Sequence, residues 1–143
     1  MKWAKEPPWL AIAKDEIGVH ETPGPASTER IIEYNSTTTL KATSDEVPWC
    51  SAFVNWCIIQ AGLEGTNSAA AVSWLKWGRK ADIKNAKSGD VVIFQWGNGK
   101  HHVGFYVEKV GSLIKCLGGN QSDQVKYSWY LKLYILGIRT IDT

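Results

Sequence analysis

The sequence has no apolar run of membrane-spanning length, no block of lysine and arginine, and few cysteines. Its 143 residues include 16 basic and 14 acidic side chains, a formal net charge of +2, and these charges are scattered along the chain. Without a basic cluster the sequence does not predict a nucleic-acid-binding surface, and without a long apolar run it does not predict a transmembrane helix. We therefore expect a chain that binds neither nucleic acid nor membrane.

The N-terminal segment lacks the continuous apolar core of a signal peptide, because Glu6, Pro7 and Pro8 interrupt it. We expect synthesis in the cytoplasm of the host without a signal peptide, so that any action outside depends on a separate release route. Hydrophobic residues make up 44% and charged residues 21%, the balance of a folded globular protein. The length predicts a single domain, residues 1–143, and we expect a monomer.

The three cysteines do not predict a disulfide framework or a zinc site. Cys50 and Cys57 lie two helical turns apart, about 10 Å along a regular helix, which is too far for a disulfide. No CxxC or clustered Cys/His spacing is present, and no Asp-rich loop indicates calcium. We expect free thiols at Cys50, Cys57 and Cys116, with no metal and no cofactor.

The first half of the chain reads as helices and the second half as strands. Helices are predicted in "WLAIAKDEI", in "TERIIEYN", from Pro48 to Gly62, and in "GTNSAAAVSWLKWG". Strands are predicted in "DVVIFQW", "HHVGFYVEKV", "SLIKCL", "VKYSWY" and "LKLYILGIRTI", with "GGNQSD" as a loop. N-terminal helices packed on a C-terminal antiparallel sheet make an α+β fold.

Cys50 occupies the predicted start of a helix, directly after Pro48 and Trp49. The partial positive charge and the unpaired N–H groups of a helix start stabilise a thiolate, and the same N–H groups can hold an oxyanion. For most cysteines a place in the core is the commoner role. Cys57 and Cys116 fit that role, being mid-helix and mid-strand, and Cys50 is the candidate nucleophile.

A thiol nucleophile needs an imidazole to exchange its proton. His101 and His102 open a predicted strand, and His102 shares a face with Gly104, which leaves space for another group to approach. We therefore assign the base to His102. Asn120, at the end of the next strand, can orient the ring, although a simple turn residue is the commoner role of a lone Asn. Asp123 is the alternative.

Four segments together resemble a known family. "VPWCSAFVNW", "SGDVVIF", "HHVGFYV" and "LGGNQSD" are similar to the landmarks of the CHAP and NlpC-type cysteine hydrolases that cleave bacterial peptidoglycan, in particular a small single-domain branch in phages and bacteria. The resemblance runs from about Glu16 to Arg139 and keeps the order of the segments.

The resemblance implies a papain-like α+β fold with Cys50 as nucleophile, His102 as base and Asn120 as the orienting residue. Many CHAP domains carry a glutamine before the cysteine, which helps to hold the oxyanion, and here Trp49 stands in that place. We assign substrate binding to Trp49, Glu21 and Asp45, Glu21 because its loop can cross near the helix start; a surface glutamate is the default interpretation.

Several functions remain open. The main prediction is a peptidoglycan hydrolase, either an N-acetylmuramoyl-L-alanine amidase or a stem-peptide endopeptidase, acting on the cell wall as a phage endolysin. The same chemistry would suit an antibacterial effector with an immunity protein as partner. The 8 tryptophans also fit a non-catalytic cell-wall-binding module. A protein amide or an acyl transfer is a further alternative, and Glu16 or Glu21 would be the acid of a glycosidase, although no second carboxylate matches.

Overall fold

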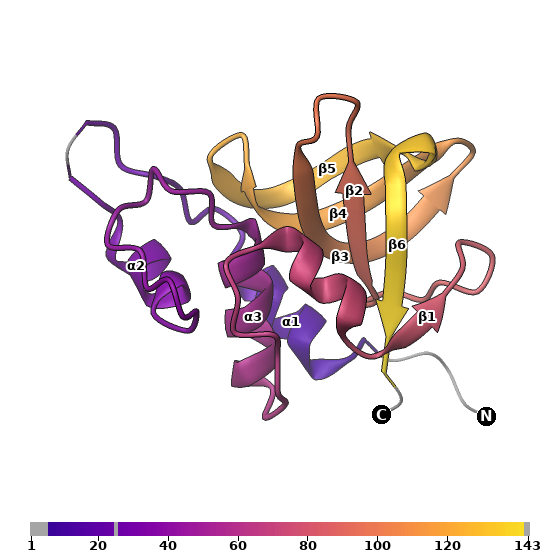
Figure 1. Cartoon of the computed structure of the whole chain (residues 1–143), viewed down its shortest axis with the longest axis horizontal. Coiled ribbons are helices and arrows are strands. Elements are labelled where there is room, and N and C mark those ends of the chain that lie inside the picture. The colour runs from indigo at the N-terminus through magenta and orange to yellow at the C-terminus, as the bar shows by residue number, and fades with distance from the viewer. Residues whose placement is uncertain (1–5, 25, 142–143) are drawn as a thin grey trace.

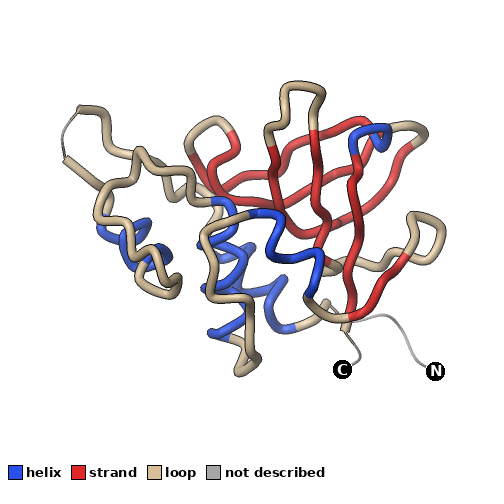
Figure 2. Tube along the Cα trace, in the orientation of Figure 1, coloured by secondary structure: helices blue, strands red, loops and turns tan. Residues whose placement is uncertain are grey.

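A computed structural model gives the fold and describes residues 6–24 and 26–141. Figures 1 and 2 show the helices that precede the first strand gathered on one side of a curved sheet. The helices are α1 (Pro8–Asp15), α2 (Glu29–Asn35), α3 (Cys50–Gln60) and the 3-10 helices η1 (Ala71–Lys76) and η2 (Lys132–Tyr134). The strands are β1 (Arg79–Ala81), β2 (Val91–Gln95), β3 (His101–Val110), β4 (Leu113–Gln121), β5 (Gln124–Leu131) and β6 (Ile135–Thr140).

The six strands form one antiparallel sheet in the order β1-β6-β2-β3-β4-β5. Helix α3 packs on β3 and β4, α1 packs on α3, and α2 packs on the outer side of α3 (Figure 1). This confirms the predicted α+β arrangement of N-terminal helices on a C-terminal antiparallel sheet. Among the described residues no helix is both long and apolar enough to span a membrane.

Each face of the sheet has its own hydrophobic core. The core between helices and sheet includes Trp49, Phe53, Trp74, Phe105 and Leu117. The core on the opposite face consists of Val92, Phe94, Tyr106, Ile114, Cys116 and Ile138. Alternation along the strands sends neighbouring side chains into different cores, so a residue's parity decides which core it joins.

Helix α3 lies within the predicted segment from Pro48 to Gly62 and is shorter than predicted, running from Cys50 to Gln60. Pro48 precedes it, Trp49 is its N-cap, and Cys50 is its first helical residue. At the other end Gly62 has φ +83°, a conformation that favours glycine, and its N–H donates to the carbonyl of Ile59. Every residue from 50 to 58 is buried, so the helix is covered on all sides rather than along one stripe.

Two predicted elements differ from the structure, and one strand was missed. Strand β4 continues to Gln121, so "GGNQSD" is not a loop; Ser122 and Asp123, with φ of 54° and 63°, form the turn into β5. The predicted helix in "GTNSAAAVSWLKWG" shortens to η1. Strand β1, which pairs with β6, was not predicted, because three residues are too few to show a period.

Candidate active site

Cys50 lies at the N-terminus of α3, where the helix start is held from both sides. Its neighbour Ser51 donates to the carbonyl of Ser68 at 2.6 Å and accepts from the indole of Trp74 at 2.8 Å. On the other side Trp49 stacks on Tyr34. Cys50 itself is 7% exposed, so its sulfur sits at a fixed and nearly buried position with the first N–H groups of the helix around it.

His102 is on β3, directly opposite Phe94 of β2, and is 8% exposed. Gly104 does leave the space that the sequence predicts beside this ring. The sulfur of Cys116 fills that space, and a methyl group on Gly104 would collide with it. His102 forms side-chain hydrogen bonds with both Cys50 and Cys116, so the imidazole lies between two thiols.

The third partner of His102 is Gln121. Its Oε1 lies 2.8 Å from Nε2 of the ring, and its Nε2 donates to the carbonyls of Lys126 at 2.6 Å and Cys116 at 3.3 Å. Because carbonyls only accept, the amide nitrogen must face them and Oε1 must face His102. The ring nitrogen Nε2 therefore carries a proton, and Nδ1 remains free to accept one.

The predicted role of Asn120 thus falls to its neighbour. In a regular strand Asn120 would share the face of Cys116 and Gly118, which is the face of His102. The register of β4 against β5 shifts between Gly118 and Gln121, and Asn120 adopts φ +57°. This bulge adds a residue and turns Gln121 toward the imidazole. Asp123, the alternative, lies in the turn, where its carbonyl accepts from the N–H of Glu21.

The electrostatics of the pair favour a thiolate beside an imidazolium. Burial alone would raise the pKa of Cys50, but the hydrogen bond and charge of His102, with the N–H groups of Val103 and Ser51, bring it below its ordinary value. Burial would lower the pKa of His102, but its hydrogen bonds to Cys116 and Cys50 raise it to about 10. The two shifts describe one coupled pair.

The other two thiols have raised pKa values. Burial, together with the charge of Glu16, holds the pKa of Cys57 well above its ordinary value. Burial also raises the pKa of Cys116, which the hydrogen bond to His102 only partly offsets. All three cysteines are free, and Cys50 is the one whose surroundings stabilise the thiolate.

The three predicted substrate-binding residues lie near the start of α3, but they make hydrogen bonds within the protein. Trp49 and Asp45 are both 0% exposed, so neither offers a surface to substrate. The Trp49 indole donates to Glu21 at 2.8 Å, and Asp45 accepts from the N–H groups of Thr22 and Thr28, each at 2.9 Å. Trp49 and Asp45 therefore brace the loops before α3, and the assignment of substrate contact to them is corrected.

Glu21 is half-buried and is the member of this group that keeps some exposure. Its pKa is raised, because burial and the nearby Asp123 and Asp45 outweigh the hydrogen bond from Trp49. The glycosidase alternative loses its other candidate, since Glu16 accepts from Tyr34 at 2.7 Å and pairs with Arg30 at 3.1 Å.

The remaining polar candidates lie outside the Cys50–His102 pair. His20 is exposed, and its ring contacts the carbonyl of Gly18. His101 is exposed and its ring contacts Gln95 at 3.2 Å. Within residues 6–24 and 26–141, no group of three or more His, Cys, Asp or Glu side chains could hold a metal ion.

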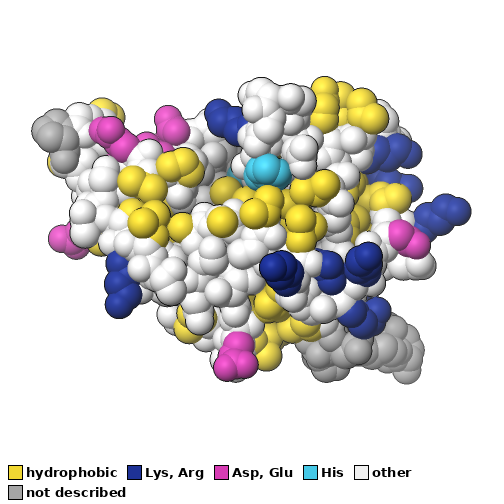
Figure 3. All heavy atoms as spheres, in the orientation of Figure 1, with side chains coloured by type: hydrophobic (Ala, Val, Ile, Leu, Met, Phe, Trp, Pro, Cys, Tyr) yellow, Lys and Arg dark blue, Asp and Glu magenta, His cyan; other side chains and the backbone are white. Residues whose placement is uncertain are grey.

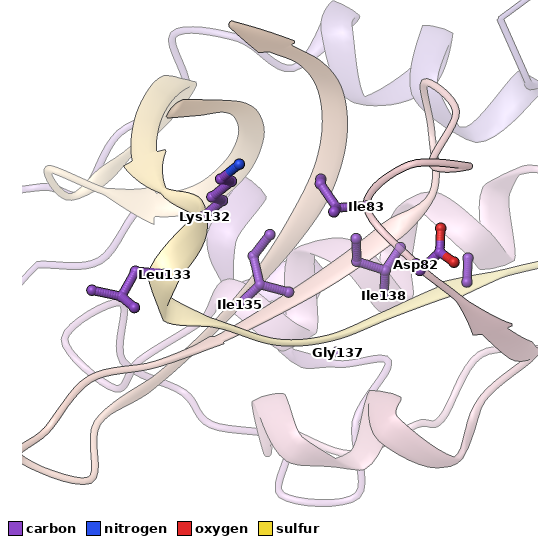
Figure 4. Close-up of a pocket in the computed structure, with 8 residues that line it drawn as sticks. Asp82, Ile83, Lys132, Leu133, Ile135, Gly137 and Ile138 are labelled. Carbon is purple, nitrogen blue, oxygen red and sulfur yellow. The ribbon is translucent and has the colours of Figure 1, made fainter. Parts of the chain in front are cut away.

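One face of the molecule carries a band of hydrophobic side chains with a histidine among them (Figure 3). A separate pocket of about 410 Å³ lies between β6 and the segment after β1 (Figure 4). It is lined by Ala81, Asp82, Ile83, Lys132, Leu133, Ile135, Gly137 and Ile138. This lining contains no cysteine, serine, threonine or histidine.

Sequence reasoning missed two residues of this site. Gln121 adjoins the predicted Asn120, and only the bulge separates their roles. Cys116 was assigned to the core, where it is 0% exposed, yet its sulfur also contacts His102. The sequence did contain one indication of this contact. Gly104 predicted that another group comes close to His102, but the sequence did not show that this group is Cys116.

Comparison with known proteins gives the family. The CHAP domain family model matches residues 42–120, more than half of the chain, and this segment contains Cys50 and His102. None of the curated proteins compared with the chain matches it.

Among solved structures, an NLP/P60-family protein similar to a lipoprotein from Staphylococcus aureus aligns at 19% identity with a TM-score of 0.60, covering 100% of this chain and 44% of that one. The chain thus spans less than half of that protein. The NlpC/p60 domain of the peptidoglycan hydrolase SagA aligns at 16% identity and TM-score 0.57, covering 96% and 100%. RipD from Mycobacterium tuberculosis aligns at 18% and 0.59, covering 94% and 95%. These likenesses show a shared fold, and the family match shows that the chain belongs to the CHAP domain family.

Proposed function

We propose that this protein is a cysteine hydrolase that cleaves an amide bond in bacterial peptidoglycan. Membership of the CHAP domain family supports a hydrolase of the cysteine-peptidase type with peptidoglycan as its target or ligand. The observation that carries the proposal is the imidazole of His102 between the lowered-pKa thiol of Cys50 and the oriented amide of Gln121. Nucleophile, base and orienting group are the three parts that such a reaction needs.

The reaction follows from the proton positions. The Cys50 thiolate attacks the carbonyl carbon of the scissile amide, and the N–H groups at the start of α3 stabilise the oxyanion that forms. His102 gives its Nδ1 proton to the leaving nitrogen as the C–N bond breaks, which leaves a thioester on Cys50. A water molecule then attacks this thioester, His102 takes one of its protons, and the C–S bond breaks to restore the thiolate–imidazolium pair.

The finer assignments remain part of the proposal. The scissile bond joins muramic acid to L-alanine in an amidase or lies within the stem peptide in an endopeptidase. We propose a monomeric phage endolysin, made in the host cytoplasm and acting on the wall after release. An antibacterial effector with an immunity protein would use the same residues.

A non-catalytic wall-binding domain is the second candidate. RipD, which shares the fold, is described as a non-catalytic NlpC/p60 domain protein adapted to peptidoglycan binding. The arrangement around Cys50 favours the hydrolase, because a binding domain has no use for a thiol of lowered pKa beside an oriented imidazole.

The test is digestion of isolated peptidoglycan with products resolved by mass. We expect Cys50→Ala to abolish product release, a loss of at least about a thousandfold, because the nucleophile is removed. Cys57→Ala is the matched control, because it also removes a buried thiol. We expect this variant to keep its peptidoglycan cleavage and to lose some stability against unfolding.

A new amine on alanine identifies an amidase, and one within the stem identifies an endopeptidase. Equal product release by Cys50→Ala and the unchanged protein would contradict the proposal. Binding without cleavage by the unchanged protein would favour the wall-binding candidate.

A further inference from the structure

We propose that Tyr130 is a positioning residue of the active site, which acts by locking the amide of Gln121 against His102. The inference rests on the proposed function, because it concerns the same imidazole. It adds a residue from β5, which lies two strands away from the histidine in the same sheet, that neither the sequence nor the family match singles out.

The contact geometry supports this role. The hydroxyl of Tyr130 donates to Oε1 of Gln121 at 3.1 Å, the same oxygen that lies 2.8 Å from Nε2 of His102. The tyrosine ring also lies against the imidazole, with centroids 5.6 Å apart. One side chain therefore touches both the ring to be oriented and the atom that orients it.

The direction of the hydrogen bonds is determined. The amide oxygen of Gln121 can only accept, so the Tyr130 hydroxyl is the donor in their hydrogen bond. The phenol proton then points to Gln121. Burial, with the charges of Cys116 and Cys50, holds the pKa of Tyr130 well above its ordinary value, so the hydroxyl stays a donor throughout the neutral range.

Gln121 is then held at both ends of its amide. Two backbone carbonyls, those of Lys126 and Cys116, accept from its nitrogen, and two donors, Tyr130 and His102, share its oxygen. A flipped amide would place its nitrogen against two donors and its oxygen against two carbonyls. Tyr130 is the part of this arrangement that keeps Oε1 in place whichever way the imidazole moves during the reaction.

The experiment measures the reactivity of Cys50 without any substrate. Purified protein is treated with iodoacetamide at pH 7, and alkylation of the Cys50 peptide is followed by mass spectrometry. We expect Tyr130→Phe to slow this reaction about three- to tenfold, the size of one hydrogen bond. With peptidoglycan fragments we expect kcat to fall by a similar factor and KM to stay unchanged, because Tyr130 acts through His102 and not on substrate.

Tyr134→Phe is the matched control. Tyr134 belongs to the same aromatic cluster through Trp96, and no hydrogen bond joins it to Gln121 among the residues that the structure describes. We expect the loss of the Tyr134 hydroxyl to change the alkylation rate of Cys50 by less than twofold. The ¹⁵N shifts of the His102 ring provide a second readout, in which we expect only Tyr130→Phe to change the tautomer populations.

A double-mutant cycle with Gln121→Leu tests the route of the effect. If Tyr130 acts through Gln121, then Tyr130→Phe has no further effect once Oε1 is gone. Equal Cys50 rates in Tyr130→Phe and Tyr134→Phe, or additive losses in the double variant, would overturn the proposal while leaving the hydrolase assignment intact. If Cys50 of the unchanged protein reacts no faster than a cysteine in a peptide, the proposed function fails and this proposal fails with it.

Discussion

Three free thiols lie in this small chain, and each sulfur has different neighbours. Cys57 is surrounded by the helix-side core, Cys116 backs onto His102 from the opposite core, and Cys50 meets both the imidazole and the N–H groups of its own helix. Burial is common to all three, so it cannot explain why one pKa falls and two rise. The partner charge and the donors at the helix start make the difference.

The pH dependence of Cys50 alkylation tests this account. In the unchanged protein we expect rapid alkylation well below the ordinary thiol pKa, since His102 stabilises the thiolate. In His102→Ala this lowering cause disappears while burial remains, so the pKa rises and the rate at pH 7 falls at least tenfold. Rates measured from pH 5 to 10 give the apparent pKa, and an unchanged profile in His102→Ala would contradict the coupling of the pair.

At the level of elements, the end of β4 shows why the loop predicted there is a strand. The Gly-Gly-Asn segment reads as a loop, because glycine and asparagine are rare in strands. In the structure, Gly118 and Gly119 let neighbouring side chains pack directly against the backbone of β4. A methyl group on Gly119 would lie 2.7 Å from Phe53 and from Trp49, and one on Gly118 would lie 2.7 Å from Oε1 of Gln121. The strand can continue to Gln121 because these positions have no side chain.

Gly118→Ala should therefore affect activity more than stability. The new methyl group would push the amide oxygen of Gln121 away from His102, and it would lie 3.3 Å from Nε2 of the ring. We expect a loss of tenfold or more in peptidoglycan cleavage and a loss of about 1 kcal/mol in unfolding free energy, the lower end of the range for small-to-large changes.

Gly97→Ala is the control, because an added methyl group there meets nothing within 4 Å. Activity assays and urea denaturation of both variants give the comparison. Full activity in Gly118→Ala would mean that His102 does not depend on Gln121 for its orientation.

For the molecule as a whole, the sheet joins two cores into one unit. Its strands contribute Val91, Ile93 and Phe105 to the helix-side core and Val92, Phe94 and Tyr106 to the other. Because alternate residues of the same strands supply both, neither core can open without disturbing β2 and β3. We therefore expect the helices and the sheet to unfold together in one transition.

Two buried thiols report on the cores separately, Cys57 on the helix side and Cys116 on the opposite side. We expect pulse labelling in increasing urea to expose both at the same midpoint, in a Cys50→Ala background that removes the reactive thiol. Labelling of Cys116 at a clearly lower urea concentration than Cys57 would show that the cores unfold independently.

The sequence alone determined what depends on neighbouring residues. Pro48 and Gly62 mark the start and end of α3, which puts Cys50 on the first turn, and alternation in β3 separates His102 from His101. The α+β class and the resemblance to CHAP domains also came from the order of local patterns.

Tertiary structure decided what depends on distant residues. Whether Asn120 or Gln121 meets the imidazole depends on a bulge that only pairing with β5 produces, and the burial of Trp49 and Asp45 depends on loops that fold back over α3. The contacts of Tyr130 and Cys116 with the site join strands whose side chains meet only once the sheet has formed. The local sequence pattern determines on which face of the sheet a side chain lies, but the register between strands determines which residue it contacts.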